Sequence, residues 1–191
     1  MHSGCSSFCL WNTQSIGPEN PYELIVGDAW NRIAPGIRAG LTPPLEASGV
    51  LRVHRSHRGF AGFIARHILL PPEGESIEAR LKLAVEPNQV RWIRQFDSMR
   101  AESLQTFQGK TYTEEAGPFK LIFWTELRGN ALAHLQVGTM LFGIPVPRFC
   151  GPIVDGLMSE GSDERSWKLV VDIRHCWFGS ICRYEGEMQV L

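Results

Sequence analysis

Apolar and polar residues alternate along most of the chain after Ser76. Between Ile77 and Val85 every second residue is apolar and most of the residues between them are charged, which predicts a half-buried strand. The same alternation returns in later segments, and turn residues separate these segments from one another. With a short strand at 49–53, the predicted strands are 76–86, 90–96, 99–107, 110–115, 119–127, 135–141, 153–160, 167–174 and 181–191. About seven to nine short strands joined by tight turns predict a curved antiparallel sheet, a barrel or half-barrel.

Two N-terminal segments have a helical period instead. Asn20 can cap a helix and Pro21 suits its first position. Apolar residues then follow at helical spacing as far as Ile33, and Pro35 is expected to end the helix. A second helix is expected at 60–69. The sequence therefore predicts an α+β fold in which two N-terminal helices cover the sheet.

Length and composition fit one globular domain. The chain has 191 residues, of which 43% are hydrophobic and 20% charged, and its formal net charge is −1. Residues 1–20 lack a period, so we expect a flexible tail followed by a single α+β domain at 21–191. The near-zero charge argues against nucleic acid as a partner. The sequence has neither a secretory signal pattern nor an apolar run of membrane-spanning length, and its five cysteines favour free thiols, so a cytoplasmic location is expected.

Arg94 is the most informative single residue. It has the same parity as Trp92 and Phe96 in its predicted strand, so its guanidinium should point inward with the apolar side chains. A guanidinium stays charged inside a barrel and needs a partner. One interpretation is an ion pair with a carboxylate near the barrel mouth. The other is a head-group anchor that holds a ligand carboxylate or phosphate. A one-residue bulge would reverse this parity.

The candidate ligand-binding residues share this inward parity. Tyr184 is among them, and its buried hydroxyl would need a partner. The predicted lining, with Arg94 as polar anchor, is Trp92, Phe96, Phe123, Leu135, Val137, Trp167 and Tyr184. A histidine or carboxylate beside Arg94 would favour an enzyme, and the residues to inspect for this role are His134, Glu126 and Asp172.

Known catalytic and cofactor motifs are missing from the sequence. Cys5, Cys9, Cys176 and Cys182 have spacings unlike those of common zinc sites. There is no glycine-rich phosphate loop and no recognisable nucleophile motif. We therefore expect no metal, no cofactor and no assigned catalytic residue.

The segment 143–148 contains Pro145 and Pro147 and cannot be a central strand. Phe142, Ile144 and Phe149 lie in or beside it. It is either a proline-stiffened crossover that plugs one end of the barrel or an exposed apolar lip for a ligand, membrane or partner.

Several short segments, in this order and spacing, resemble a bacterial family that is known only as a domain of unknown function, DUF4166. The segments are 22–30 (YELIVGDAW), 62–72 (GFIARHILLPP), 91–96 (RWIRQF), 141–147 (LFGIPVP) and 183–186 (RYEG). The resemblance covers about Tyr22 to Met188 and implies a bacterial origin. Because some members are fused to saccharopine-dehydrogenase-like reductases, it also implies a reductase partner. It implies no catalytic residues.

Three functional hypotheses follow. The leading one is non-catalytic binding of a small lipophilic or anionic ligand in a barrel-like cavity. The alternatives are a protein-interaction or regulatory module for a reductase partner, and an enzyme with an unrecognised site inside the barrel.

Overall fold

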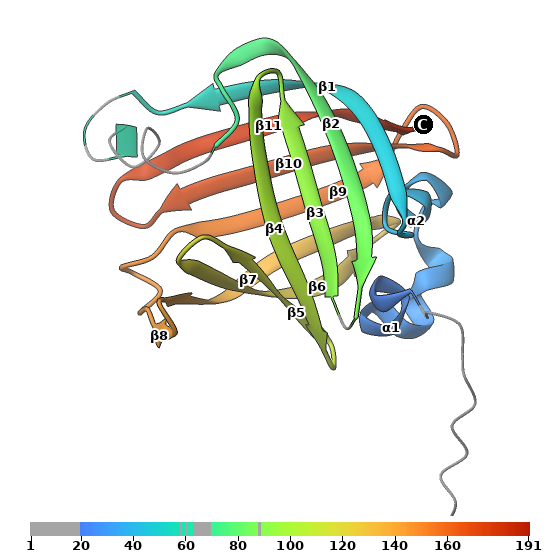
Figure 1. The fold of residues 1–191 in the computed structure, drawn as a ribbon, viewed down its shortest axis with the longest axis horizontal. Helices are drawn as coiled ribbons and strands as arrows, with labels where there is room; N and C mark the ends of the chain where they lie inside the picture. Colours follow the sequence, from blue (N-terminus) through green and yellow to red (C-terminus); the bar gives the residue numbers. More distant parts are fainter. Residues whose placement is uncertain (1–19, 58, 60, 63–69, 88) are drawn as a thin grey trace, which may run out of the picture.

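A computed structural model of the chain describes residues 20–57, 59, 61–62, 70–87 and 89–191. The described residues contain eleven antiparallel strands (Figure 1). They are β1 (Leu45–Arg55), β2 (Gly74–Glu86), β3 (Gln89–Phe96), β4 (Met99–Gln108), β5 (Thr111–Ala116), β6 (Phe119–Arg128), β7 (Ala131–Leu141), β8 (Ile144–Pro145), β9 (Ile153–Glu160), β10 (Ser166–His175) and β11 (Gly179–Val190).

Ten of these strands close into a barrel. Their order is β6-β5-β4-β3-β2-β1-β11-β10-β9-β7, and β6 pairs with β7 to complete the ring. The short strand β8 pairs only with the end of β7, outside the ring. The expected curved antiparallel sheet is therefore confirmed as a closed barrel, with slightly more strands than the expected seven to nine.

The helices lie at one end of the barrel, which we call the helical end (Figure 1). Asn20 caps α1 (Pro21–Val26) as predicted, because its side chain accepts a hydrogen bond from the Tyr22 amide at 3.1 Å. The predicted helix to Ile33 is interrupted, however, because Gly27 has a φ of +62° and ends the α-helix. A 3₁₀ helix, η1 (Gly27–Arg32), follows.

Pro35 begins a helix rather than only ending one. It is the first residue of α2 (Pro35–Gly40), where its fixed φ suits the first turn. A Cβ at Gly36 would lie 1.8 Å from the backbone oxygen of Ser166, and one at Gly40 would lie 2.8 Å from the Trp167 ring. The two glycines therefore let α2 pack directly against the start of β10.

Two predicted segments fall mainly outside the described residues. Apart from Asn20, the expected tail at 1–20 is not described, and the expected helix at 60–69 is described only at residues 61 and 62. The segment 143–148 is a crossover between β7 and β9 that includes β8. Phe142 beside it is 79% exposed. Among the described residues, no helix has both the length and the apolar character needed to span a membrane.

A β-bulge in β7 corrects two of the expected lining residues. Ile122 pairs with Gly138 and Phe123 with Gln136, so Val137 is an extra residue in the ladder. The bulge shifts the side-chain parity along β7, and His134 rather than Leu135 faces the interior. The expectation that Leu135 and Val137 line a cavity is therefore wrong, and Val137 is 58% exposed.

Candidate functional site

The interior of the barrel contains a partly open cavity of about 260 Å³. Its apolar wall includes Leu121, Phe123, Val154, Leu169, Val171 and Ile173. Polar side chains also face it, and these include Tyr22, Arg94, Gln105, Tyr112, Glu114, His134 and Tyr184. A smaller cavity of about 50 Å³ shares several of the same residues, among them Trp92 and Arg94. The barrel interior is therefore not completely filled by side chains, and its polar groups are few and clustered.

Arg94 forms an ion pair inside the barrel. Its Nη2 lies 2.8 Å from Oε1 of Glu114 on β5, and its Nη1 donates a hydrogen bond to the Ser103 hydroxyl at 2.8 Å. Ser103 also donates to Glu114, at 2.7 Å. The guanidinium lies over the Trp92 ring, 4.7 Å from its centroid. The structure therefore shows the ion pair, the first of the two interpretations of Arg94, and places it on the cavity wall.

The electrostatics keep both members of this pair charged. Burial opposes the charge on Arg94, but the nearby carboxylate of Glu114 outweighs it and the pKa of Arg94 is raised. Burial would likewise raise the pKa of Glu114, but the charge of Arg94 and hydrogen bonds from Ser103 and Gln105 lower it. About 21% of the Arg94 side chain and 15% of the Glu114 side chain remain exposed, and both residues line the cavity. The two charges thus cancel beside the cavity.

Helix α1 completes this network from the helical end. The Tyr22 hydroxyl donates to Oε1 of Gln105 at 2.6 Å and accepts from Nε1 of Trp92 at 2.7 Å. Gln105 in turn donates to Oε2 of Glu114 at 2.9 Å. Tyr22 is fully buried and packs edge-on against Phe107, with ring centroids 4.9 Å apart. An N-terminal helix therefore supports the polar wall of the cavity directly.

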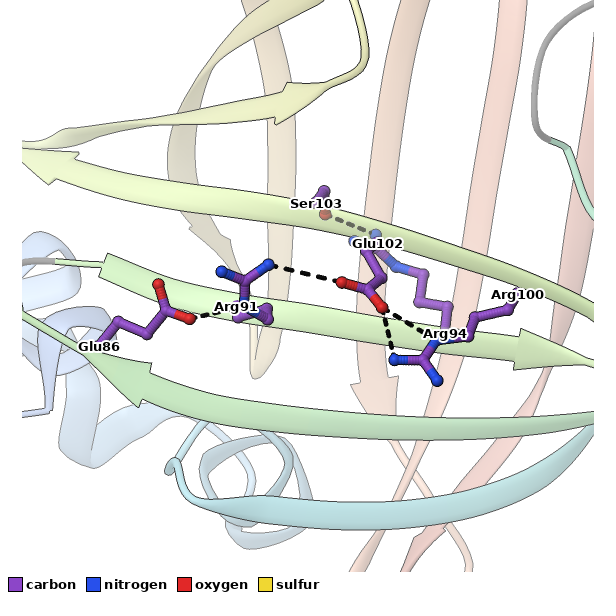
Figure 2. A network of polar contacts seen from close by, with 6 residues as sticks. All are labelled: Glu86, Arg91, Arg94, Arg100, Glu102 and Ser103. Carbon is purple, nitrogen blue, oxygen red and sulfur yellow. Dashed lines mark hydrogen bonds and ion pairs between the residues drawn. The ribbon is translucent and has the colours of Figure 1, made fainter.

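On the outside of the barrel, β2, β3 and β4 carry a separate row of charges, which Figure 2 shows together with the hydrogen bond from Arg94 to Ser103. Arg91 bonds Glu86 at 2.6 Å and Glu102 at 3.5 Å, and Arg100 bonds Glu102 at 2.5 Å. Because Arg91 and Arg94 are three residues apart on one strand, their side chains lie on opposite faces. Glu102 and Arg100 in this row are solvent-exposed, whereas Arg91 and Glu86 are half-buried. Glu102 is therefore a suitable control for the inner pair.

His134 is the second polar group of the cavity. Its Nδ1 lies 3.1 Å from the Tyr112 hydroxyl, and its ring packs edge-on against Tyr112, which stacks on Phe123. Burial lowers the pKa of His134 to about 4, although the charge of Glu114 acts in the opposite direction. The imidazole is therefore neutral at neutral pH. Its Nε2 forms no hydrogen bond with any residue that the structure describes.

Tyr184 on β11 is the third polar group. Its ring packs against Phe96, with centroids 6.1 Å apart, and burial raises the pKa of its hydroxyl to about 12. Within the described part of the chain, this hydroxyl has no hydrogen-bond partner. Tyr184 therefore brings a neutral hydroxyl to the cavity wall.

The structure brings most of the predicted site residues together. Arg94, Trp92, Phe96, Phe123 and Tyr184 all line the cavity. Trp167 is buried under α2 and lines only the smaller cavity. Of the residues considered for an enzyme, His134 faces the cavity, but Glu126 is paired with Arg128 and Asp172 with Arg174 in partly exposed ion pairs.

Sequence reasoning missed Glu114, the partner of Arg94. The available signal was parity, because Tyr112 and Glu114 lie on the same face of β5 and Tyr112 is buried. The sequence also does not indicate that the hydroxyl of Tyr22, in the first turn of a predicted helix, joins the polar network. Neither pairing could be found without the order of the strands.

The described residues do not form a metal site. No group of three or more His, Cys, Asp or Glu side chains is arranged to hold an ion in the parts of the chain that are described. Cys150, Cys176 and Cys182 are free thiols, whereas Cys5 and Cys9 lie outside the described residues.

Replacing Tyr22 with Phe should lower the free energy of unfolding by about 2 kcal/mol, because Gln105 and Trp92 would each lose a buried hydrogen-bond partner. Urea denaturation measures this change. Tyr184→Phe is the matched control and should change stability by less than about 0.5 kcal/mol, since its hydroxyl has no partner among the described residues. Equal losses in the two variants would show that the Tyr22 hydroxyl has no special role.

Comparison with solved structures shows a similar barrel elsewhere. A protein of unknown function from the DUF3598 family of Nostoc punctiforme is 12% identical, with a TM-score of 0.53 over 84% of this chain. This chain spans only 50% of that structure. A second structure, named REP1-NXSQ fatty acid transporter, is 6% identical, with a TM-score of 0.37, over 75% of this chain and 93% of its own length. The first similarity supports the fold alone.

No curated protein matches the sequence of this chain. A family model does match it, over residues 44–188, which include every strand of the barrel except the last two residues of β11. That model is described as a domain of unknown function, DUF4166, the family that the sequence segments resemble. The matched region is well over half of the chain, and the protein therefore belongs to the DUF4166 family.

Proposed function

We propose that this protein binds a small lipophilic molecule in the cavity of its barrel and performs no chemistry on it. The observation that supports this proposal is a closed barrel that retains about 260 Å³ of space behind a mainly apolar wall. Barrels of this size can be filled by their own side chains or can hold one molecule. Native interiors contain few voids larger than a water molecule, because empty space costs packing energy.

The size of the cavity limits the ligand. An apolar cavity of about 150 Å³ accommodates benzene, so the space here suits a molecule of roughly ten non-hydrogen atoms. In the proposal, Trp92, Phe96 and Phe123 contact the apolar part of the ligand, and Arg94 and Tyr184 belong to the polar wall. The unpaired state of the three described cysteines supports a cytoplasmic location.

A Gly156→Leu variant tests the proposal. Gly156 on β9 lines the cavity, and a Cβ at this position would meet only the His134 side chain, at an ordinary 3.6 Å. The leucine side chain would therefore extend into the cavity without displacing the backbone. With n-butylbenzene, an apolar probe of roughly the right size, isothermal titration calorimetry should show at least about tenfold weaker binding to this variant.

Val137→Leu is the matched control, because it adds apolar volume on the outside of the neighbouring strand β7. It should bind the probe like the parent protein. Equal affinities of the parent and the Gly156→Leu variant would place the probe outside the cavity and contradict the proposal.

A second candidate function, docking to a protein partner such as a reductase, is supported by exposed apolar residues near the ends of β7 and β10. These are Phe142, Ile144, Phe149, Trp177 and Phe178, and the Phe149 and Trp177 rings are 5.7 Å apart. Exposed patches of this kind often mark interaction surfaces. Docking here would not need the cavity, so Gly156→Leu should remove ligand binding and leave docking intact.

The enzyme hypothesis has less support. A general base works best with a pKa near the working pH, and the pKa of His134 is lowered to about 4. Glu114 already accepts hydrogen bonds from Arg94, Ser103 and Gln105. The polar groups of the cavity are thus arranged to bind rather than to transfer protons.

A further inference from the structure

The cavity contains charged side chains, yet it offers no uncompensated charge to a ligand. Arg94 and Glu114 neutralise each other at 2.8 Å. The carboxylate is further held by Ser103 and Gln105, and the guanidinium is fixed over Trp92. A ligand carboxylate would have to displace Glu114 from Arg94 or lie buried without a countercharge of its own. Both arrangements are costly in a desolvated interior.

Two neutral polar groups remain available to a ligand. They are Nε2 of His134 and the hydroxyl of Tyr184, neither of which is hydrogen-bonded to a described residue. When the Tyr112 hydroxyl donates to Nδ1, the neutral ring carries its proton on Nε2 and can donate to a ligand oxygen. A tyrosine hydroxyl can both donate and accept. Together they suit an oxygen atom without a full charge.

The strand register places these two groups in one row of paired residues that crosses four strands. His134 pairs with Gly156, Gly156 with Val171, and Val171 with Tyr184. The two polar side chains are thus three strand steps apart around a curved sheet, and both line the same cavity. Gly156, which lies between them in this row, has no side chain and therefore leaves space inside the cavity. A ligand head group in this part of the cavity would lie between His134 and Tyr184.

We infer that the ligand carries an uncharged hydroxyl or carbonyl head group that is hydrogen-bonded by His134 and Tyr184, and that it is not a carboxylate. This inference rests on the proposed function and specifies its ligand class. The apolar remainder of the ligand would lie against Phe123, Leu169 and Val171.

Three probes of similar size separate the alternatives by calorimetry at pH 7.5: 1-nonanol, nonanoate and n-butylbenzene. We expect 1-nonanol to bind at least about tenfold more tightly than nonanoate, because only the anion would bury a charge without a countercharge, which is unfavourable. Tyr184→Phe and His134→Phe should each weaken the binding of 1-nonanol about fivefold, which is the effect of one hydrogen bond. Neither variant should change the affinity for n-butylbenzene. Tyr184→Phe removes no hydrogen bond to a described residue, so it should fold normally.

Other outcomes contradict either the head-group inference alone or the proposed function as well. If nonanoate binds as tightly as 1-nonanol, or if the two variants do not discriminate 1-nonanol from n-butylbenzene, the head-group inference is wrong and the lipophilic cavity stands. If none of the three probes binds, the proposed function fails, and this inference fails with it.

Discussion

Replacing Glu114 with Gln is expected to lower the free energy of unfolding by about 3–5 kcal/mol, because it leaves the buried charge of Arg94 without a countercharge. Gln is nearly isosteric with Glu, so the change removes the charge and keeps most of the packing. The guanidinium cannot lose its proton to relieve the loss. Equilibrium unfolding in guanidinium chloride measures the change as a shift in midpoint.

Two further variants make this result specific. Glu102→Gln removes an exposed carboxylate from the outer row in Figure 2 and should cost less than about 1 kcal/mol, because such pairs are solvated. The double variant Arg94→Met with Glu114→Gln removes both charges and should recover most of the loss. If the Glu114→Gln variant is as stable as Glu102→Gln, water in the cavity solvates Arg94. The claim that Arg94 and Glu114 must neutralise each other beside the cavity would then be wrong.

Acidification should destabilise the protein through His134. The folded-state pKa of His134 is lowered to about 4 by burial, whereas an unfolded histidine has a pKa near 6.5. Between these values the unfolded chain binds a proton that the folded protein excludes, so stability falls as the pH drops from about 6.5 to 4. The loss amounts to up to about 3 kcal/mol for this shift. The ionisable groups that face the ring are Glu114 and Tyr112, and Glu114 only moderates the effect.

Unfolding midpoints measured at intervals across this pH range test the assignment. His134→Phe should flatten the slope between pH 4 and 6.5 by the same amount. Glu114 acts in a lower window, because its folded-state pKa is lowered and its contribution disappears only as the pH falls through that value. An unchanged slope in His134→Phe would show that another group is responsible.

The alternation of apolar and polar residues was sufficient to predict the sheet and much of its inner face. Trp92, Arg94 and Phe96 face inward as their parity requires, and so does Tyr184. The strands β4 and β5 gave the weakest signal. Their inward residues include Ser103, Gln105 and Glu114, and polar residues on the buried face erase the alternation. The sequence signal was therefore faintest where the polar wall of the candidate site is built.

Other features depend on long-range geometry that a pattern cannot contain. The bulge at Val137 exposes that residue and brings His134 to the cavity. Gly138 beside it hints at a bulge, because an isolated glycine inside a strand often marks one, but it does not fix which residue is extra. The contact between Arg94 and Glu114 joins β3 to β5 across β4, so it needs the order of the strands. The break at Gly27 could have been anticipated from a glycine inside a predicted helix.

The most direct test of the central claim is native mass spectrometry of the freshly purified protein, with solvent extraction of anything that it carries. We expect one bound molecule per chain, lipophilic and uncharged at its head, with roughly ten non-hydrogen atoms. It should be absent from Gly156→Leu and present in Val137→Leu. If the parent protein shows only the mass of the ligand-free chain across several preparations, or if Gly156→Leu carries the same bound molecule, a ligand-binding role for the cavity is contradicted.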